Sequence, residues 1–433
     1  MLIFVSDLHL TDTRSRTTID LCYFIKRLER IIIYARQDEV DEIELVLLGD
    51  IFELLKSVEW LRNNEKNFRP WDLTFNGFHT QTVNKIFEGI LINNECFFAG
   101  LRRLHQDYKL KITYVPGNHD RAINEDIGLG ARKLLQAELP LERLAGSKFV
   151  DMFTCMEHKV VAYHGHEWDE SNHYSEKGAA IGDAVVIDVV ARLPYLVGEY
   201  LGLDCENVAL DFLHEIDNFY SHNPGVLKRW IELHLTTLDA AKNKNKTQIL
   251  AEEAVYKAIK DIAQYFIKLA QRTQFHSLDN FQQWRILKPT LRLISTTTKV
   301  TPGVAYKLLF ALLNLWADKE GYEGGGHPSV SKAVARLDTL QPYHDYCYII
   351  SGHTHKPLVS HFPKSAKASE QISAHLNTGT WRKIYRPTSP LMAGSPFSWQ
   401  YEESLVIVYS PKEHNRLRIS PYELHRTLRG AKR

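Results

Sequence analysis

Short apolar runs alternate with amphipathic stripes over residues 1–120. The runs Leu2–Ser6, Ile43–Leu48 and Ile112–Val115 have the length of buried strands. Apolar residues recur at helical spacing from Leu21 to Ala35, and a second helical pattern extends from about Thr82 to Gln106. Strands that alternate with helices predict a βαβαβ start and a mainly parallel sheet with right-handed crossovers.

The middle of the chain has a helical pattern. The clearest stripe is Ile249–Leu269, and another extends from Pro302 to Trp316. Strand patterns lie on both sides of this region. They are Phe149–Thr154 and Val160–Tyr163 before it, and Tyr346–Ser351, Ile372–Leu376, Ser404–Tyr409 and Leu417–Ser420 after it.

These patterns predict an α/β fold, with a sheet core flanked by helices and interrupted by a large helical insertion. Residues 1–170 and 345–433 are expected to form the two parts of the core, and residues 171–344 the insertion. A chain of 433 residues exceeds one average domain, which agrees with this division. The insertion either caps a site in the core and influences substrate choice, or forms a separate helical subdomain.

Charge and cysteine content narrow the function classes. Lys and Arg number 53 against 52 Asp and Glu, so the net charge of +1 makes nucleic acid an unlikely partner. Five scattered cysteines without CxxC spacing argue against a disulfide framework or a zinc knuckle, and favour a reducing compartment. The beginning MLIFVSDLHL lacks the basic region of a signal peptide.

The most apolar later stretch, Ala184–Gly202, carries Asp188, Arg192 and Glu199. These charges argue against a membrane span. No transmembrane segment is therefore expected, and the expected location is cytoplasmic.

Five short polar clusters follow predicted strands. In an open α/β sheet, the loops at the carboxyl ends of the strands meet at one crevice, so these clusters are expected to lie together. If Asp7–His9 and His353–His355 are extended, alternate side chains in each segment also point the same way. The clusters are Asp7-Leu8-His9, Gly49-Asp50, Gly117-Asn118-His119-Asp120, His164-Gly165-His166 and Gly352-His353-Thr354-His355.

Seven of these side chains are suitable ligands for two divalent cations. They combine carboxylate and amide oxygen with imidazole nitrogen and include no cysteine, which suits manganese first and also iron or zinc. Paired metals lower the pKa of bound water and stabilise both oxygens of an in-line displacement at phosphorus. The candidate ligands are Asp7, His9, Asp50, Asn118, His164, His353 and His355.

The five motifs occur in the order found in the calcineurin-like metallophosphoesterase superfamily, which the chain resembles over residues 1–170 and 345–433. The resemblance implies that His119 lies beside the phosphoryl group and that Asp120 orients it. It also implies two metal sites bridged by Asp50. Asp7, His9 and His355 would hold the first metal, and Asn118, His164 and His353 the second.

Within that superfamily, the wording of the first, second and last motifs is most similar to the UDP-2,3-diacylglucosamine pyrophosphohydrolases. His119 stands where those enzymes commonly have arginine, and the large insertion is a second difference. The protein Ser/Thr phosphatases have Asp-Arg-Gly after the Gly-Asp motif, whereas this chain continues Ile51-Phe52-Glu53. The branch that contains those phosphatases is therefore disfavoured.

The expected function is hydrolysis of a phosphodiester, pyrophosphate or phosphomonoester on a small substrate such as a nucleotide, nucleotide-sugar or lipid phosphate. A nuclease of the same superfamily and an inactive metal-binding scaffold are the alternatives. The sequence does not identify the substrate, the physiological metal or the oligomeric state.

Several residues near the motifs have more than one candidate role. His166 either contacts substrate, replaces a metal ligand or forms a supporting hydrogen bond in its loop, and the supporting bond is favoured. Asp169 and Arg121 either contact substrate or form surface ion pairs. His375 and Asn377 either line the crevice or support it. Trp60 and Trp71, with Arg62 and Arg69, either stack on a nucleotide base or anchor a loop, and the anchor is slightly favoured.

Overall fold

The computed structural model describes residues 1–13, 19–62, 69–70, 77–169, 171–172, 179–218, 224–273, 275, 289, 302–313, 346–363, 372–388, 397–413 and 420–430. Trp71, the predicted helix beyond Leu313 and most of the predicted strand Leu417–Ser420 lie outside these residues. The described residues form a mixed α/β fold with two large sheets and one small one.

The first sheet joins strands from both parts of the predicted core. Its strands follow the order β11-β12-β1-β2-β3, and β13 also pairs with β12. Ile3 lies opposite Leu45 in a parallel ladder and opposite Ile407 in an antiparallel one. The strands are β1 (Leu2–Val5), β2 (Glu44–Leu48), β3 (Lys111–Val115), β11 (Trp381–Pro387), β12 (Phe397–Val408) and β13 (Tyr422–Gly430).

The prediction of a mainly parallel sheet is wrong for the later strands. The ladders β1–β2 and β2–β3 are parallel, but β11, β12 and β13 run antiparallel to their neighbours. The predicted strand Ser404–Tyr409 is the end of the longer β12. The last strand lies beyond the predicted Leu417–Ser420, because β13 begins at Tyr422.

The second sheet has the order β6-β7-β8-β10-β9. Its strands β7, β8 and β10 are parallel, while β6 and β9 pair antiparallel at its edges. Phe149 does not belong to this sheet, as the predicted strand Phe149–Thr154 required, but to a separate two-stranded ribbon. The strands are β6 (Phe153–Cys155), β7 (Val160–Ala162), β8 (Tyr348–Ser351), β9 (Pro357–Pro363) and β10 (Ile372–Thr378), and the ribbon is β4 (Leu144–Ala145) with β5 (Lys148–Phe149).

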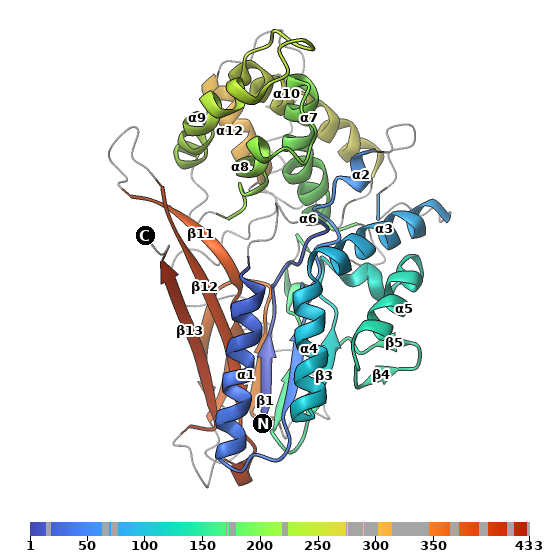
Figure 1. The fold of residues 1–433 in the computed structure, drawn as a ribbon, viewed down its shortest axis with the longest axis vertical. Coiled ribbons are helices and arrows are strands. Elements are labelled where there is room, and N and C mark those ends of the chain that lie inside the picture. The colour runs from blue at the N-terminus through green and yellow to red at the C-terminus, as the bar shows by residue number, and fades with distance from the viewer. Residues whose placement is uncertain are drawn as a thin grey trace.

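Helices α1 (Leu21–Gln37) and α4 (Glu95–Tyr108) cover the face of the first sheet that is turned away from the second sheet (Figure 1). Asp20 caps the first of them, since its side chain accepts a hydrogen bond from the amide of Tyr23. The predicted single helix from Thr82 to Gln106 is divided at Asn94, whose side-chain amide donates to the carbonyls of Ile90 and Thr11. The helices of the N-terminal part of the chain are α1 (Leu21–Gln37), α2 (Glu59–Arg62), α3 (Gly77–Asn93), α4 (Glu95–Tyr108) and α5 (Leu129–Glu138).

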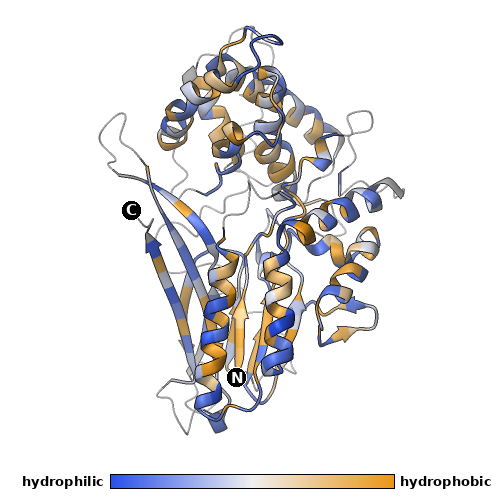
Figure 2. Ribbon diagram, viewed as in Figure 1, coloured by the Kyte–Doolittle hydropathy of each residue, from blue (hydrophilic) through white to orange (hydrophobic). Residues whose placement is uncertain are grey.

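The alternation of side chains along β1 produces two cores. Ile3 and Val5 face the helices, whereas Leu2 and Phe4 pack between the two sheets with residues such as Ile350. Figure 2 shows the apolar central strands and the polar outer sides of α1 and α4. The result is a layer of helices, the first sheet and then the second sheet.

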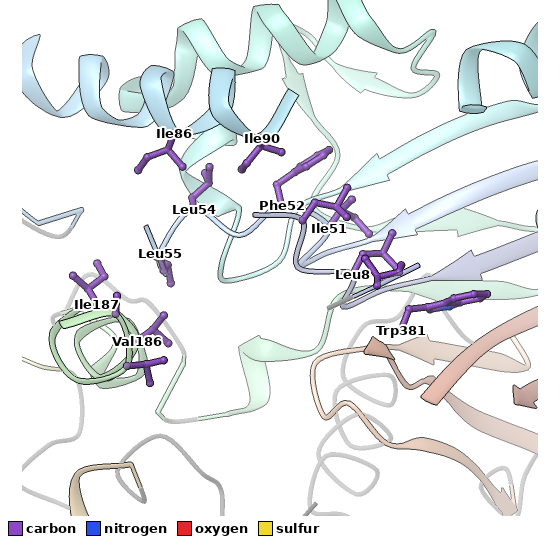
Figure 3. Packing of buried hydrophobic residues seen from close by; sticks show 14 of the residues in the cluster. Leu8, Ile51, Phe52, Leu54, Leu55, Ile86, Ile90, Val186, Ile187 and Trp381 are labelled. Carbon is purple, nitrogen blue, oxygen red and sulfur yellow. The ribbon is translucent and has the colours of Figure 1, made fainter. Parts of the chain in front are cut away.

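The helices of the insertion gather at one end of the molecule, opposite the N-terminus (Figure 1). Figure 3 shows Leu55, just after the Gly49-Asp50 motif, beside Val186 and Ile187 of the insertion. The helices are α6 (Ile181–Val185), a π-helix (Val186–Ala191), α7 (Arg192–Leu201), α8 (Asp211–His214), α9 (Pro224–Ala241), α10 (Ala251–Arg272) and α12 (Pro302–Leu313).

The predicted stripe Ile249–Leu269 corresponds to α10, and the predicted helix at Pro302 to α12. Among the helices of the described residues, none combines the length and apolar character needed to cross a bilayer. The limits 171 and 344 of the insertion remain a prediction.

Candidate metal centre

The candidate ligands lie at the carboxyl ends of five strands. Asp7 and His9 follow β1, Asp50 follows β2, and Asn118 follows β3. On the second sheet His164 follows β7, while His353 and His355 follow β8. Because β1, β2 and β3 are parallel, and β7 is parallel to β8, each sheet brings its own loops to one edge.

The ligand segments are not extended, so the expected alternation along them is wrong. Asp7, His9, Asp50, His353 and His355 all have positive φ, between 47° and 70°. Non-glycine residues avoid this left-handed region, and those that adopt it gather at functional sites. These turns bring Asp7 and His9 to one group of ligands, and they direct His355 to that group and His353 to a second one.

Asp7, His9 and His355 form the first group. His355 Nε2 lies 3.2 Å from Asp7 Oδ1 and 3.1 Å from His9 Nε2. The two imidazole nitrogens therefore face each other across a small space beside a carboxylate oxygen. That combination suits a borderline divalent cation.

Asp50, His164 and His353 form the second group. His164 Nε2 lies 3.1 Å from Asp50 Oδ2, and the same oxygen lies 3.9 Å from His9 Nε2 in the first group. Asp50 therefore stands between the two groups, in the position expected of a carboxylate shared by two cations.

Three buried atoms in this centre have no hydrogen-bond partner among the described residues. They are Asp7 Oδ1, Asn118 Oδ1 and His164 Nε2. Asn118 is only 1% exposed. Asp7 Oδ1 and His164 Nε2 lie near His355 and Asp50, but without the geometry of a hydrogen bond. Buried polar atoms are normally satisfied, so these three atoms fit cations as their missing counterparts.

Two glycines permit the close approach of these groups. A Cβ at Gly117 would lie 2.3 Å from Asp50 Oδ1, and one at Gly352 would lie 2.2 Å from Ser6 Oγ and 2.6 Å from Asp7 Oδ2. Side chains at either position would displace a candidate ligand.

The ligands are oriented by hydrogen bonds outside the two groups. His164 Nδ1 lies 2.9 Å from the carbonyl of Leu48, and His353 Nε2 lies 2.9 Å from Asp169 Oδ2. Partners of this kind fix the ring orientation and tautomer of metal-binding histidines. Asp169, for which substrate contact and ion pairing were both open, has the supporting role.

His119 is oriented by Glu53. Its Nδ1 lies 2.8 Å from Glu53 Oε2, and His9 Nδ1 lies 2.9 Å from the same oxygen. The orienting role expected of Asp120 is therefore wrong. The carboxylate of Asp120 instead accepts hydrogen bonds from the amides of Gly117, Ile51 and Phe52, and so fixes the loop that carries Asp50.

The carboxylates and imidazoles of the centre shift one another's pKa values. Burial would raise the pKa of Asp7, but His355 and His164 hold it at about 2. Burial would lower the pKa of His164, yet Asp50 and Asp7 raise it to about 10. The centre thus holds carboxylates ionised, which metal binding requires, and cations binding there would displace protons from imidazole.

The other residues near the motifs, for which alternative roles were expected, make structural contacts. Arg121 pairs with Asp183 of α6 at 2.6 Å, so this ion pair joins the third motif to the insertion. His375 and Asn377 are buried and bond to Ser351 Oγ at the end of β8, so they support the strand that leads to His353. Burial lowers the pKa of His166 to about 4, and the ring lies beside His164 with centroids 5.5 Å apart.

The tryptophan and arginine residues near the second motif anchor the chain. The indole of Trp60 is 4% exposed and donates to the carbonyl of Leu54. Arg69 is 1% exposed and pairs with Asp188 of the insertion. Arg62 pairs with Glu59 on the surface.

Sequence reasoning missed Glu53 and Asp183. Glu53 lies three residues after Asp50, and its place in the Gly-Asp loop was a usable signal. Asp183 gave no signal, because its contact with Arg121 depends on how the insertion packs.

Comparison with protein-family models gives no match for the chain, and comparison with curated proteins gives none either. The case for a function therefore depends on the residues and geometry described above.

Proposed function

We propose that the chain is a dinuclear-metal phosphohydrolase with a metallophosphoesterase-type core. The observation that supports this most directly is the pair of ligand groups, Asp7-His9-His355 and Asp50-His164-His353. Their members come from both ends of the chain, and Asp50 stands between the groups. An arrangement of oxygen and nitrogen ligands around two adjacent positions suits two Mn²⁺ ions, with iron or zinc as alternatives.

In this proposal the two groups and Asn118 hold the cations. When bound, paired cations would acidify water and offset negative charge at phosphorus. The contribution of the chain is to hold the ligands in one orientation before substrate arrives. His164 does this through Leu48, His353 through Asp169 and His9 through Glu53.

His119 would contact the reacting phosphoryl group. With Nδ1 bonded to Glu53, the imidazole would act through Nε2. Nε2 could then donate a proton or a hydrogen bond to the leaving oxygen. The ring faces the same pocket as His9 and His355, so it lies on the correct side of the ligand groups.

The test is metal content together with hydrolysis. Purified protein should bind about two Mn²⁺ per chain and hydrolyse bis-p-nitrophenyl phosphate or p-nitrophenyl phosphate. His119→Ala should retain the metals but lose most of the rate, typically 10²–10⁴-fold for a general acid.

Each failure has a distinct meaning. Bound metals without turnover of any phosphoester, nucleotide or nucleotide-sugar substrate would favour an inactive scaffold. Cleavage restricted to DNA or RNA would favour a nuclease. Failure to bind metals at all would contradict the proposal.

A further inference from the structure

A pocket beside the first ligand group contains hydrogen-bond donors that have no acceptor within the described part of the chain. Its lining includes three histidines of the candidate centre, His9, His119 and His355. It also includes Lys56, Asn218 and Arg382, which come from three different parts of the chain. Lys56 and Arg382 are cationic and carry only hydrogen-bond donors, and Asn218 adds the N–H donors of its amide. These three side chains favour an anion.

Arg382 is the main cation of this pocket. It lies on β11, directly after the buried Trp381, which fixes the strand. Its Nε is buried and has no hydrogen-bond partner among the described residues. The other contact of the guanidinium is long, since Nη1 lies 3.5 Å from the carbonyl of Asp217.

Asn218 supplies a second donor. The residue is 5% exposed, and its side-chain Nδ2 is buried without a hydrogen-bond partner in the described part of the chain. Its backbone is held firmly, because its carbonyl accepts from the amide of Tyr385 and its amide donates to the carbonyl of Glu215, both at 2.9 Å. The side chain is therefore held in place from the main chain.

The remaining charges of the pocket cancel one another. Lys56 contacts both oxygens of Asp217, at 2.7 and 2.9 Å. Glu53 is shared by His9 and His119. Arg382 helps Lys56 to lower the pKa of Asp217, but it forms no carboxylate ion pair among the described residues. Arg382 is only partly buried, but its buried Nε has no acceptor among the described residues, so an anion that enters the pocket would satisfy it.

We propose that Arg382 and Asn218 form an oxyanion subsite that holds non-bridging oxygens of the substrate phosphate beside the metal centre. This inference rests on the proposed function and assigns residues to it. The planar guanidinium offers paired N–H donors that match phosphate oxygens, and the amide of Asn218 adds a neutral donor from the insertion. The insertion thereby takes part in substrate recognition through the segment Glu215–Asn218, which joins α8 to the pocket.

The experiment is calorimetric titration with inorganic orthophosphate, first on chelator-treated protein and then with Mn²⁺. The variants are Arg382→Gln, which removes the charge, and Asn218→Asp, which is isosteric and places a carboxylate against the anion. Arg103→Gln is the matched control, since Arg103 pairs with Glu29 and joins α4 to α1, and neither residue lines the pocket. Arg382→Lys keeps the charge but not the paired donors, and thermal melting checks that each variant is folded.

Both pocket variants should weaken orthophosphate binding about tenfold or more, while Arg103→Gln stays within about twofold of the parent. Arg382→Lys should fall between the parent and Arg382→Gln. With p-nitrophenyl phosphate, Arg382→Gln should raise KM more than it lowers kcat, because it removes binding rather than the reacting groups.

Unchanged phosphate affinity in folded Arg382→Gln and Asn218→Asp, or no phosphate binding by the parent with or without Mn²⁺, would overturn the subsite. If the variants weaken phosphate binding but the parent hydrolyses nothing, the subsite stands and the proposed function fails. If the parent is an active hydrolase and the variants bind phosphate normally, the function stands and the subsite fails.

Discussion

Glu53 places a carboxylate oxygen 2.8 Å from Nδ1 of His119. The same side chain holds His9 and accepts hydrogen bonds from the amides of Leu55 and Lys56, so its position is fixed from four directions. One buried carboxylate therefore aligns a candidate ligand and the candidate proton donor together.

Replacing Glu53 by Gln should lower kcat about 10–100-fold, the usual cost of losing a residue that orients a metal ligand. Metal content should decrease less than activity, because His9 Nε2 still faces Asp7 and His355. Elemental analysis and initial rates measure the two effects. Glu142→Gln, at an exposed position, is the control, and equal rates for the two variants would contradict the assigned role of Glu53.

Replacing Asp50 by Asn should reduce metal binding below two ions per chain. Asp50 Oδ2 faces both His164 and His9, so a neutral amide weakens both positions at once. Activity with Mn²⁺ should fall at least about 100-fold if the shared carboxylate is essential. The exposed Asp107→Asn tests whether loss of any carboxylate has this effect, and full metal occupancy in Asp50→Asn would argue against a bridged centre.

The buried ion group of the insertion predicts a pH-dependent stability. Asp188 is fully buried between Arg69 and Arg192, at 2.8 and 2.7 Å. Burial would raise its pKa, but the two guanidinium groups outweigh that effect and lower it. The folded-state pKa thus lies below the unfolded value, so the stabilisation is present at neutral pH and is lost as the pH falls below the ordinary aspartate value of 3.8.

Asp188→Asn should destabilise the protein at neutral pH by about 3–5 kcal/mol, because two buried guanidinium groups lose their counter-charge. Urea unfolding at several pH values measures the change. The variant should lose less stability than the parent on acidification, since it lacks the titrating group. Asp151→Asn, at an exposed position, should follow the parent, and parallel curves for Asp188→Asn and the parent would refute the account.

Two surface cysteines are expected to respond to oxidation. Cys22 at the start of α1 and Cys96 at the start of α4 have sulfur atoms 3.1 Å apart, and both are exposed. Diamide should accept two electrons and two protons from them and leave a disulfide. Burial and Cys22 raise the pKa of Cys96 to about 11, so the reaction should accelerate as the pH rises.

Thiol titration should then show two fewer reactive cysteines, and peptide mapping should link residues 22 and 96. Cys22→Ser should abolish the link, whereas Cys205→Ser should leave it intact. Oxidised parent protein with all five thiols still reactive would contradict the prediction.

Local signals in the sequence located most of the candidate centre, because strand ends followed by Asp, Asn or His indicate chemistry wherever they occur. They did not identify Glu53 as the partner of His119, since the choice between Glu53 and Asp120 depends on the turn after β2. The same limit applies to β13. Its basic residues Arg426 and Arg429 resemble a solvated tail, but they pair with Glu402 and Glu403 of β12. Such long-range pairing leaves no periodic signal.

Asn94 shows a different limit. Its place inside an apolar periodic stretch gave no reason to divide the helix there, and the hydrogen bond that ends α3 reaches Thr11 in a distant loop. Contacts at large sequence separation determine such boundaries.

The separation of His9 and His355 by 346 positions has a consequence during protein synthesis. At ribosomal rates of about 5–20 residues per second, roughly 20 to 70 s pass between the appearance of one histidine and the other. For that interval the nascent polypeptide carries Asp7 and His9 without their partners, and β1 lacks the neighbour β12. In the proposed function, newly made chains would therefore bind two cations only near the end of translation, and products that terminate in the insertion would be inert.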